Sequence, residues 1–358
     1  MSRVSILSRL RIDPYIVALL AMVAVASLLP ARGVVATGFG YATTIAIGFL
    51  FFLYGARLST KEVIDGLKYW RLHSVMLAST FLLFPLLGLA AKLLVPSVLT
   101  PELYVGLMFL CCLPSTVQSS IALTSIARGN MAAAICGASL SNLIGIVLTP
   151  LLVALLLSTG SSGDRVSLIS VRDIILQLLA PFMAGQLLRR WIGGFVNKHK
   201  KVLGYVDRGA ILLVVYAAFS RGVVAGVWGR LLPVSLILLL MVNIVLLAIM
   251  MMTTTVAARR LGFSREDEIA IVFCGSKKSL ASGIPMAIVL FPAATVSLTV
   301  LPLMLFHQIQ LMVCAWLARR YAARSVAPQP AEKLIATSKQ RMFGPRGAPP
   351  SSRDAGPL

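Results

Sequence analysis

The sequence has few charged residues for its length. Of its 358 residues, 13% are charged and 58% are hydrophobic, whereas soluble domains carry about 25% charged residues. A water-soluble fold of this length would need a polar surface that these charges are too few to build. The apolar residues instead come in blocks of roughly 17 to 27, which suit a hydrocarbon layer of about 30 Å. The composition therefore predicts an integral membrane protein surrounded by the lipid bilayer.

Carboxylates are scarcer still, and none lies deep in an apolar block. The twelve acidic residues are Asp13, Glu62, Asp65, Glu102, Asp164, Asp173, Asp207, Glu266, Asp267, Glu268, Glu332 and Asp354. Cation pathways through membranes usually use buried carboxylates. The five cysteines also lack metal-ligand spacing. We therefore expect no metal site and no cofactor.

We identify ten apolar segments, which predict an all-α polytopic membrane protein with ten transmembrane helices. They run over roughly 14–30, 35–57, 71–95, 101–127, 130–158, 173–192, 205–228, 232–257, 266–291 and 294–318. The predicted organisation is a cytoplasmic N-terminus at 1–13, two five-helix repeats at 14–158 and 159–322, and a disordered cytoplasmic tail at 323–358.

The excess of positive over negative charge is 21. Nucleic-acid binding is one explanation of such an excess, but in a membrane protein Lys and Arg in the loops set the topology. If both termini are cytoplasmic, most of these residues lie inside. The outer side then holds Arg32, Lys92, Arg165, Arg172, Arg221 and Arg230. We therefore expect a multi-pass protein of the cell (inner) membrane with no nucleic-acid partner; the sequence leaves its oligomeric state open.

The fourth segment, GLMFLCCLPSTVQSSIALTSIARGN, has polar residues near mid-depth. The candidates are Pro114, Ser115, Thr116, Gln118, Ser119 and Ser120. Proline removes a backbone donor, and a helix broken there frees polar groups that only protein or a wet cavity can satisfy. The alternative is a continuous kinked helix whose hydroxyls bond to their own backbone.

The ninth segment, EIAIVFCGSKKSLASGIPMAIVLF, has two adjacent lysines at its centre. The candidates here are Gly275, Ser276, Lys277, Lys278 and Ser279. A lysine at that depth costs roughly 2.5 to 3.5 kcal/mol on insertion scales. Neighbouring side chains on a helix point about 100° apart, so the two face one cavity only if the helix unwinds. Placing them in a loop instead leaves flanking runs too short to span, which favours a broken helix.

The two interrupted segments are five apart in the order of segments. Because five is odd, the two halves would have opposite orientation, as in the inverted repeats of transporters. Half-helix N-termini at such breaks favour an anion. Ser139, Ser141 and Asn142 of the fifth segment could face the fourth. No general base accompanies a nucleophile, so we expect no enzyme.

Two stretches, CCLPSTVQSSIALTSIARGN and VFCGSKKSLASGIPM, carry a resemblance to a known family. Over roughly residues 10–322 the sequence resembles the bile acid:sodium symporter superfamily (solute carrier family 10), in the branch of its member 7 and bacterial relatives. The resemblance implies two inverted five-helix repeats, a panel and a core domain, and broken helices 4 and 9 that cross. It also implies alternating access for an organic anion, with Na⁺ as the candidate coupling ion.

The resemblance also identifies departures at the sodium sites of the family. Phe273 falls where sodium-coupled members have a glutamate, and Lys277 or Lys278 falls near their glutamine. Ala134 and Ala138 fall where they have hydroxyls. Our hypothesis is that a lysine ammonium occupies a vacated sodium site.

The sequence therefore favours a secondary active transporter of a small organic anion, with an altered ion site. The alternative is a non-transporting membrane regulator of ion entry or envelope processing on the same fold. It would use the basic loops and tail to recruit partners.

Overall fold

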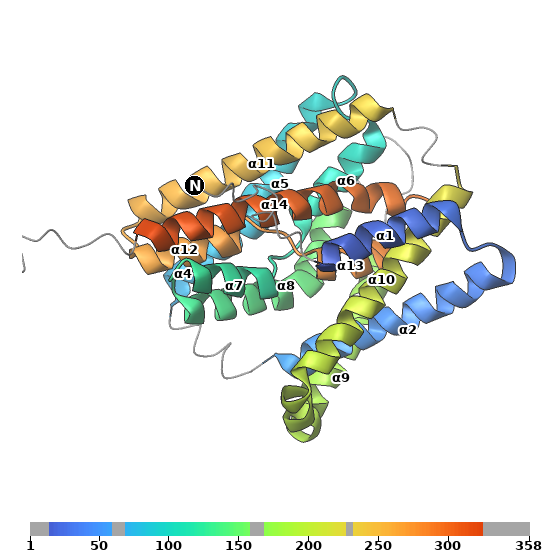
Figure 1. The fold of residues 1–358 in the computed structure, drawn as a ribbon, viewed down its shortest axis with the longest axis horizontal. Coiled ribbons are helices and arrows are strands. Elements are labelled where there is room, and N and C mark those ends of the chain that lie inside the picture. Colours follow the sequence, from blue (N-terminus) through green and yellow to red (C-terminus); the bar gives the residue numbers. More distant parts are fainter. Residues whose placement is uncertain (1–13, 59–68, 158–167, 227–231, 325–358) are drawn as a thin grey trace, which may run out of the picture.

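The computed structural model describes residues 14–58, 69–157, 168–226 and 232–324, and within these ranges the chain is helical and contains no strand (Figure 1). The predicted cytoplasmic N-terminus and nearly all of the predicted disordered tail lie outside the described residues. The described helices follow the apolar segments, because in lipid a helix satisfies its own backbone hydrogen bonds.

The helices of the first half are α1 (Pro14–Leu28), α2 (Gly33–Arg57), α4 (Trp70–Ala78), the π-helical turn η2 (Ser79–Leu83), α5 (Phe84–Ala90), the 3₁₀ turn η3 (Ala91–Leu94), α6 (Pro101–Cys112), α7 (Gln118–Ile126) and α8 (Met131–Leu157). Those of the second half are α9 (Leu168–Lys198), α10 (Lys200–Val224), α11 (Pro233–Arg260), α12 (Arg265–Gly275), α13 (Leu280–Leu290) and α14 (Val296–Arg324).

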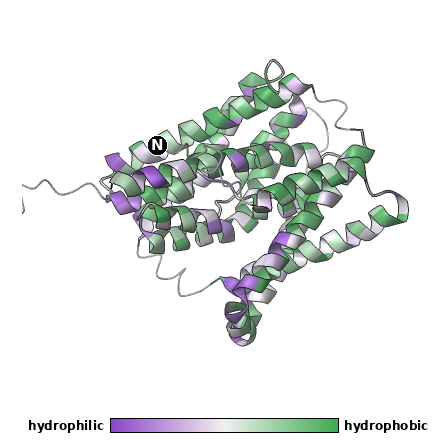
Figure 2. Cartoon of the chain, viewed as in Figure 1, coloured by the Kyte–Doolittle hydropathy of each residue, from purple (hydrophilic) through white to green (hydrophobic). Residues whose placement is uncertain are grey.

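Six of the described helical stretches are long and apolar enough to cross a membrane. They are Gly33–Arg57, Trp70–Leu94, Met131–Leu157, Lys200–Val224, Pro233–Arg260 and Val296–Ala323. Large apolar side chains also face outward, among them Leu28, Val34 and Leu93, which are 80%, 88% and 86% exposed. Figure 2 shows that hydrophobic residues predominate along most of the helices. This surface would be unfavourable in water and suits lipid, so the chain is a multi-pass membrane protein.

Four helices form one side of the molecule. Helix α2 packs against α9 and α10, and α1 packs against α10 (Figure 1). The α2–α9 contact is backbone to backbone, because a Cβ on Gly55 would lie 1.9 Å from the Phe182 carbonyl oxygen. A Cβ on Gly185 would lie 2.0 Å from the Phe52 carbonyl oxygen. Small residues at helix interfaces are how membrane helices approach this closely.

The boundary between the sixth and seventh predicted segments was wrong. We expected a loop between residues 192 and 205, but α9 continues to Lys198 and α10 begins at Lys200. The basic residues here lie in helical turns with a single non-helical residue, His199, between them. Lysine and arginine are good helix formers, so an end of apolar sequence does not require an end of helix.

Both predicted interruptions are present in the structure. Helix α6 ends at Cys112 and α7 begins at Gln118, which leaves a first break at residues 113–117. Helix α12 ends at Gly275 and α13 begins at Leu280, which leaves a second break at residues 276–279. Leu113 has extended backbone, so the alternative of a continuous kinked helix was wrong.

Candidate functional site

The two breaks lie directly against each other. The Ser279 amide donates to the Pro114 carbonyl oxygen at 2.9 Å. The Ser115 hydroxyl donates to the Cys274 carbonyl oxygen at 2.5 Å. The structure thus brings together candidates that lie more than 150 residues apart in the sequence.

Backbone groups freed at the first break find partners on α8. The Cys112 carbonyl accepts from the Thr149 hydroxyl at 2.8 Å. The Ser115 carbonyl accepts from the Asn142 side-chain amide at 2.7 Å, and the Ser115 amide donates to the Ser141 hydroxyl at 3.1 Å. Asn142 was predicted to face this segment. Of the other two side chains predicted to face it, Ser141 makes one of these bonds and Ser139 makes none.

Asn142 also reaches the second break. Its side-chain oxygen accepts from the Ser282 hydroxyl at 2.7 Å. The Ser279 hydroxyl accepts from the Ser282 amide at 3.1 Å and so caps the N-terminus of α13. One amide side chain therefore connects α8, the first break and α13.

Lys278 is completely buried and its ammonium is fully hydrogen-bonded. Its Nζ donates to the carbonyl oxygens of Thr80, Cys111 and Leu113 at 2.9, 2.8 and 2.6 Å. The same Nζ lies 4.1 Å from the centroid of the Phe84 ring. Neither Thr80 nor Phe84 was a candidate, because their contribution is a backbone carbonyl and a ring face that no sequence motif identifies.

The backbone of Lys278 is held by Gln310 of α14. The Gln310 side-chain oxygen accepts from the Lys278 amide at 2.9 Å, and its side-chain nitrogen donates to the Lys278 carbonyl at 2.9 Å. That nitrogen also lies 2.8 Å from Nδ1 of His307. An amide side chain in the middle of an apolar helix was the only sequence signal for this contact.

Lys277 is equally buried but far less well bonded. Both lysines are 0% exposed. The one hydrogen bond described for the Lys277 Nζ goes to the Ser119 hydroxyl at 3.4 Å, which is long. The Phe273 ring centroid lies 5.6 Å from the same nitrogen. Ser119 is half-buried and its neighbour Gln118 is exposed, so the surroundings of Lys277 extend toward the surface.

The two ammonium groups lie at helix ends of opposite polarity. Lys278 faces carbonyls at the C-terminus of α6, which carries partial negative charge. Lys277 contacts the second residue of α7, whose N-terminus carries partial positive charge and has no side-chain cap. The α6 end stabilises a cation, whereas the α7 end repels one and favours an anion beside it.

The remaining candidates are parts of the scaffold around the breaks. The Ser120 hydroxyl donates to the Phe273 carbonyl at 3.0 Å, and the Thr116 and Ser119 hydroxyls lie 2.7 Å apart. The Ser276 hydroxyl bonds to its own helix, and Gly275 packs where a Cβ would lie 3.2 Å from Ser79. Within the described part of the chain, no cluster of three or more His, Cys, Asp or Glu could hold a metal ion.

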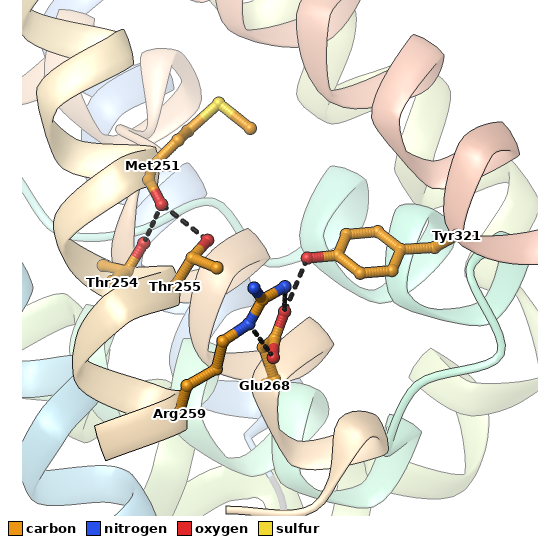
Figure 3. A network of polar contacts seen from close by, with 6 residues as sticks. All are labelled: Met251, Thr254, Thr255, Arg259, Glu268 and Tyr321. Carbon is orange, nitrogen blue, oxygen red and sulfur yellow. Dashed lines mark hydrogen bonds and ion pairs between the residues drawn. The ribbon is translucent and has the colours of Figure 1, made fainter. Parts of the chain in front are cut away.

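A second polar network fixes the far end of α12 (Figure 3). Arg259 of α11 donates twice to the Glu268 carboxylate, at 2.9 and 3.0 Å. The Tyr321 hydroxyl of α14 donates to the same carboxylate at 2.9 Å. The start of α12 is thereby attached to both long neighbours, so this half-helix is held at its polar end as well as at the break.

Comparisons with known proteins identify a family and several relatives of the chain. The profile of the SBF-like CPA transporter family matches residues 13–323. The chain is similar to an uncharacterized protein of Pseudomonas aeruginosa, 58% identical over 313 residues (87% of this chain, 93% of the relative). It is 52% identical over 310 residues to a protein of Escherichia coli named as a symporter, YfeH (87% and 93%). It is 31% identical over 336 residues to sodium/bile acid cotransporter 7 of Rattus norvegicus (92% and 98%).

Proposed function

The chain belongs to the SBF-like CPA transporter family, and from that membership and the geometry of the two breaks we propose that it is a secondary active transporter of a small organic anion. The anion binds between Lys277 and the N-terminus of α7. Ser119 is the first side chain that it displaces from the Lys277 ammonium.

One observation carries this proposal: Lys277 is a buried ammonium with a single long hydrogen bond beside the positive end of a helix. An ammonium has three donors, and a buried charge needs compensation. Within the described residues, ion pairs join arginines to Asp207 and Glu268, and none reaches Lys277. A carboxylate or sulfonate placed there would supply the missing acceptors and neutralise both positive groups.

The architecture proposed around this site is two inverted five-helix repeats, at residues 14–158 and 159–322. In the transport cycle the side formed by α1, α2, α9 and α10 moves against the remaining helices. Support comes from the equal placement of the breaks in the two halves and from the backbone contact that joins α2 to α9. Both termini lie in the cytoplasm in this arrangement, in an inner membrane, because that orientation places most Lys and Arg inside.

The names of the relatives guide the choice of solute. The rat relative is named a sodium/bile acid cotransporter and the E. coli relative a symporter. These names favour an amphipathic carboxylate or sulfonate as the first class to screen, with and without Na⁺. A carried anion of this kind matches the single cation of Lys277.

The experiment is a thermal-shift screen of organic anions on the purified protein, followed by uptake into proteoliposomes. A ligand that binds the folded state raises Tm with concentration by mass action. We expect Lys277→Met to abolish both the shift and uptake. Lys92→Met removes one exposed positive charge elsewhere and should leave both unchanged.

Two results would contradict the proposal. If Lys277→Met responds to the anion as the native protein does, the anion binds elsewhere. If reconstituted protein moves no anion that stabilises it, the chain is a non-transporting regulator on the same fold.

A further inference from the structure

Two distortions of the backbone, the π-helical turn η2 and the first break, meet around the Lys278 ammonium. The Thr80 carbonyl belongs to the π-helical turn η2, where the Phe84 amide donates to Ser79, five residues back. In an α-helix that amide would have bonded to Thr80. The Thr80 carbonyl is therefore released from its helix and points to Lys278 instead, at 2.9 Å.

The other two carbonyls are released by the first break. The amide that would bond to the Cys111 carbonyl in a continuous helix is that of Ser115, which donates to Ser141 instead. Leu113 follows the last residue of α6 and has extended backbone. The cage around Lys278 thus consists of three carbonyls that separate local departures from α-helix make available.

The number of donors in this cage matches a charged amine. A protonated lysine has three N–H donors and no acceptor. Three carbonyls accept at 2.6–2.9 Å, and a neutral amine would leave one of them without a donor. The Phe84 ring 4.1 Å away adds a cation–π contact.

The same set of groups is suited to a free monovalent cation. Carbonyl oxygens in channels replace the hydration shell of such ions without any carboxylate. The cage around Lys278 likewise has carbonyl oxygens, a helix C-terminus and a ring face, and within the described residues its three acceptors are all backbone atoms. The groups of this cage carry no formal charge, so they suit a monovalent ion.

We propose that Lys278 is a tethered monovalent cation, which fills a carbonyl cage that would otherwise bind a free alkali-metal ion. The protein therefore keeps the two breaks assembled without bound Na⁺. The consequence for transport rests on the proposed function: binding of the carried anion would not require a free cation in the cage around Lys278. Lys277, one residue earlier, keeps its charge for the substrate.

The test is to empty the cage and offer free cations. Lys278→Ala is purified in choline chloride, and its Tm is followed while Na⁺, K⁺ or ethylammonium replaces choline. We expect a lower Tm than that of the native protein in choline and a saturable rise, by about 5 °C at about 100 times Kd, for at least one of these cations. The native protein should show no saturable response to any of them.

Lys277→Ala is the matched control, because it makes the same substitution one residue away from the cage. It should acquire no cation response. A folded Lys278→Ala protein that no cation stabilises would overturn the proposal. So would saturable stabilisation of the native protein by Na⁺, a measurement that remains decisive if Lys278→Ala does not fold.

These outcomes are separate from those of the proposed function. They are read from stability in cations and need neither substrate nor transport. A protein that binds no organic anion but whose Lys278→Ala variant gains a cation response would refute the proposed function and support the cage. The reverse pattern would refute only the cage.

Discussion

Replacing Gln310 should destabilise the protein by more than the loss of one hydrogen bond, because its side chain pairs with two backbone groups. Its amide pairs with both backbone groups of Lys278, at 2.9 Å each, and the residue is 0% exposed. Gln310→Met keeps the length of the side chain and removes both bonds. Each buried backbone group left without a partner costs about 1–3 kcal/mol, so we expect a loss of about 2–6 kcal/mol in the free energy of unfolding.

The cysteines of the chain provide an assay. All five are free and buried, so a thiol-reactive dye reports their exposure as the protein unfolds. Heating gives Tm, and titration with a denaturing detergent gives the free energy of unfolding. Gln308→Met is the control, because it makes the same change on the same helix at a half-buried residue. We expect its free energy of unfolding to change by less than about 0.5 kcal/mol.

Equal stability of the two variants would refute this reasoning. It would mean that the Lys278 backbone finds other partners when Gln310 is removed. The conformation of the second break would then not depend on α14, and another contact would have to hold the Lys278 backbone in place.

Two further predictions concern the scaffold. Gly55→Ala should lower the free energy of unfolding by about 1–3 kcal/mol through overpacking, because its Cβ would lie 1.9 Å from the Phe182 carbonyl oxygen. Gly48→Ala on the same helix meets nothing within 4 Å and should be neutral or slightly stabilising. Equal effects of the two substitutions in detergent unfolding would contradict a backbone contact between α2 and α9. Tyr321→Phe removes a hydrogen bond to the Glu268 carboxylate and should lower the free energy of unfolding by about 1.5–3 kcal/mol. Tyr205→Phe, at a residue 73% exposed, should change this free energy little in the same assay. If Tyr321→Phe is as stable as the native protein, the network of Figure 3 adds no stability.

Much of the fold could be predicted from the sequence, because lipid imposes simple rules on it. Apolar length indicates a spanning helix, and a polar interruption at mid-depth indicates a break. Both breaks lie where Pro114 and the Lys277–Lys278 pair indicated. Helix ends were less predictable, as at His199, because charged residues outside the membrane continue a helix as readily as they end it.

The π-helical turn at Ser79–Leu83 could not be predicted in this way. Its sequence, STFLL, is an ordinary apolar stretch, with only Pro85 beyond it as a local irregularity. In the π-helical register the donor to the Thr80 carbonyl would be residue 85, a proline without an N–H, so this carbonyl accepts from the Lys278 ammonium instead. That partner lies 198 residues away in the sequence, so the local sequence does not identify it.

By itself, the sequence determined that two lysines lie at the centre of a membrane helix with no carboxylate at that depth. It could not distinguish the two, because adjacent residues of one type share the same local sequence. Only the tertiary structure decided that Lys278 faces three released carbonyls at the C-terminus of α6, whereas Lys277 faces the N-terminus of α7. The physical reason is that the unwound backbone directs the two side chains toward helix ends of opposite charge, and those ends come from remote parts of the chain.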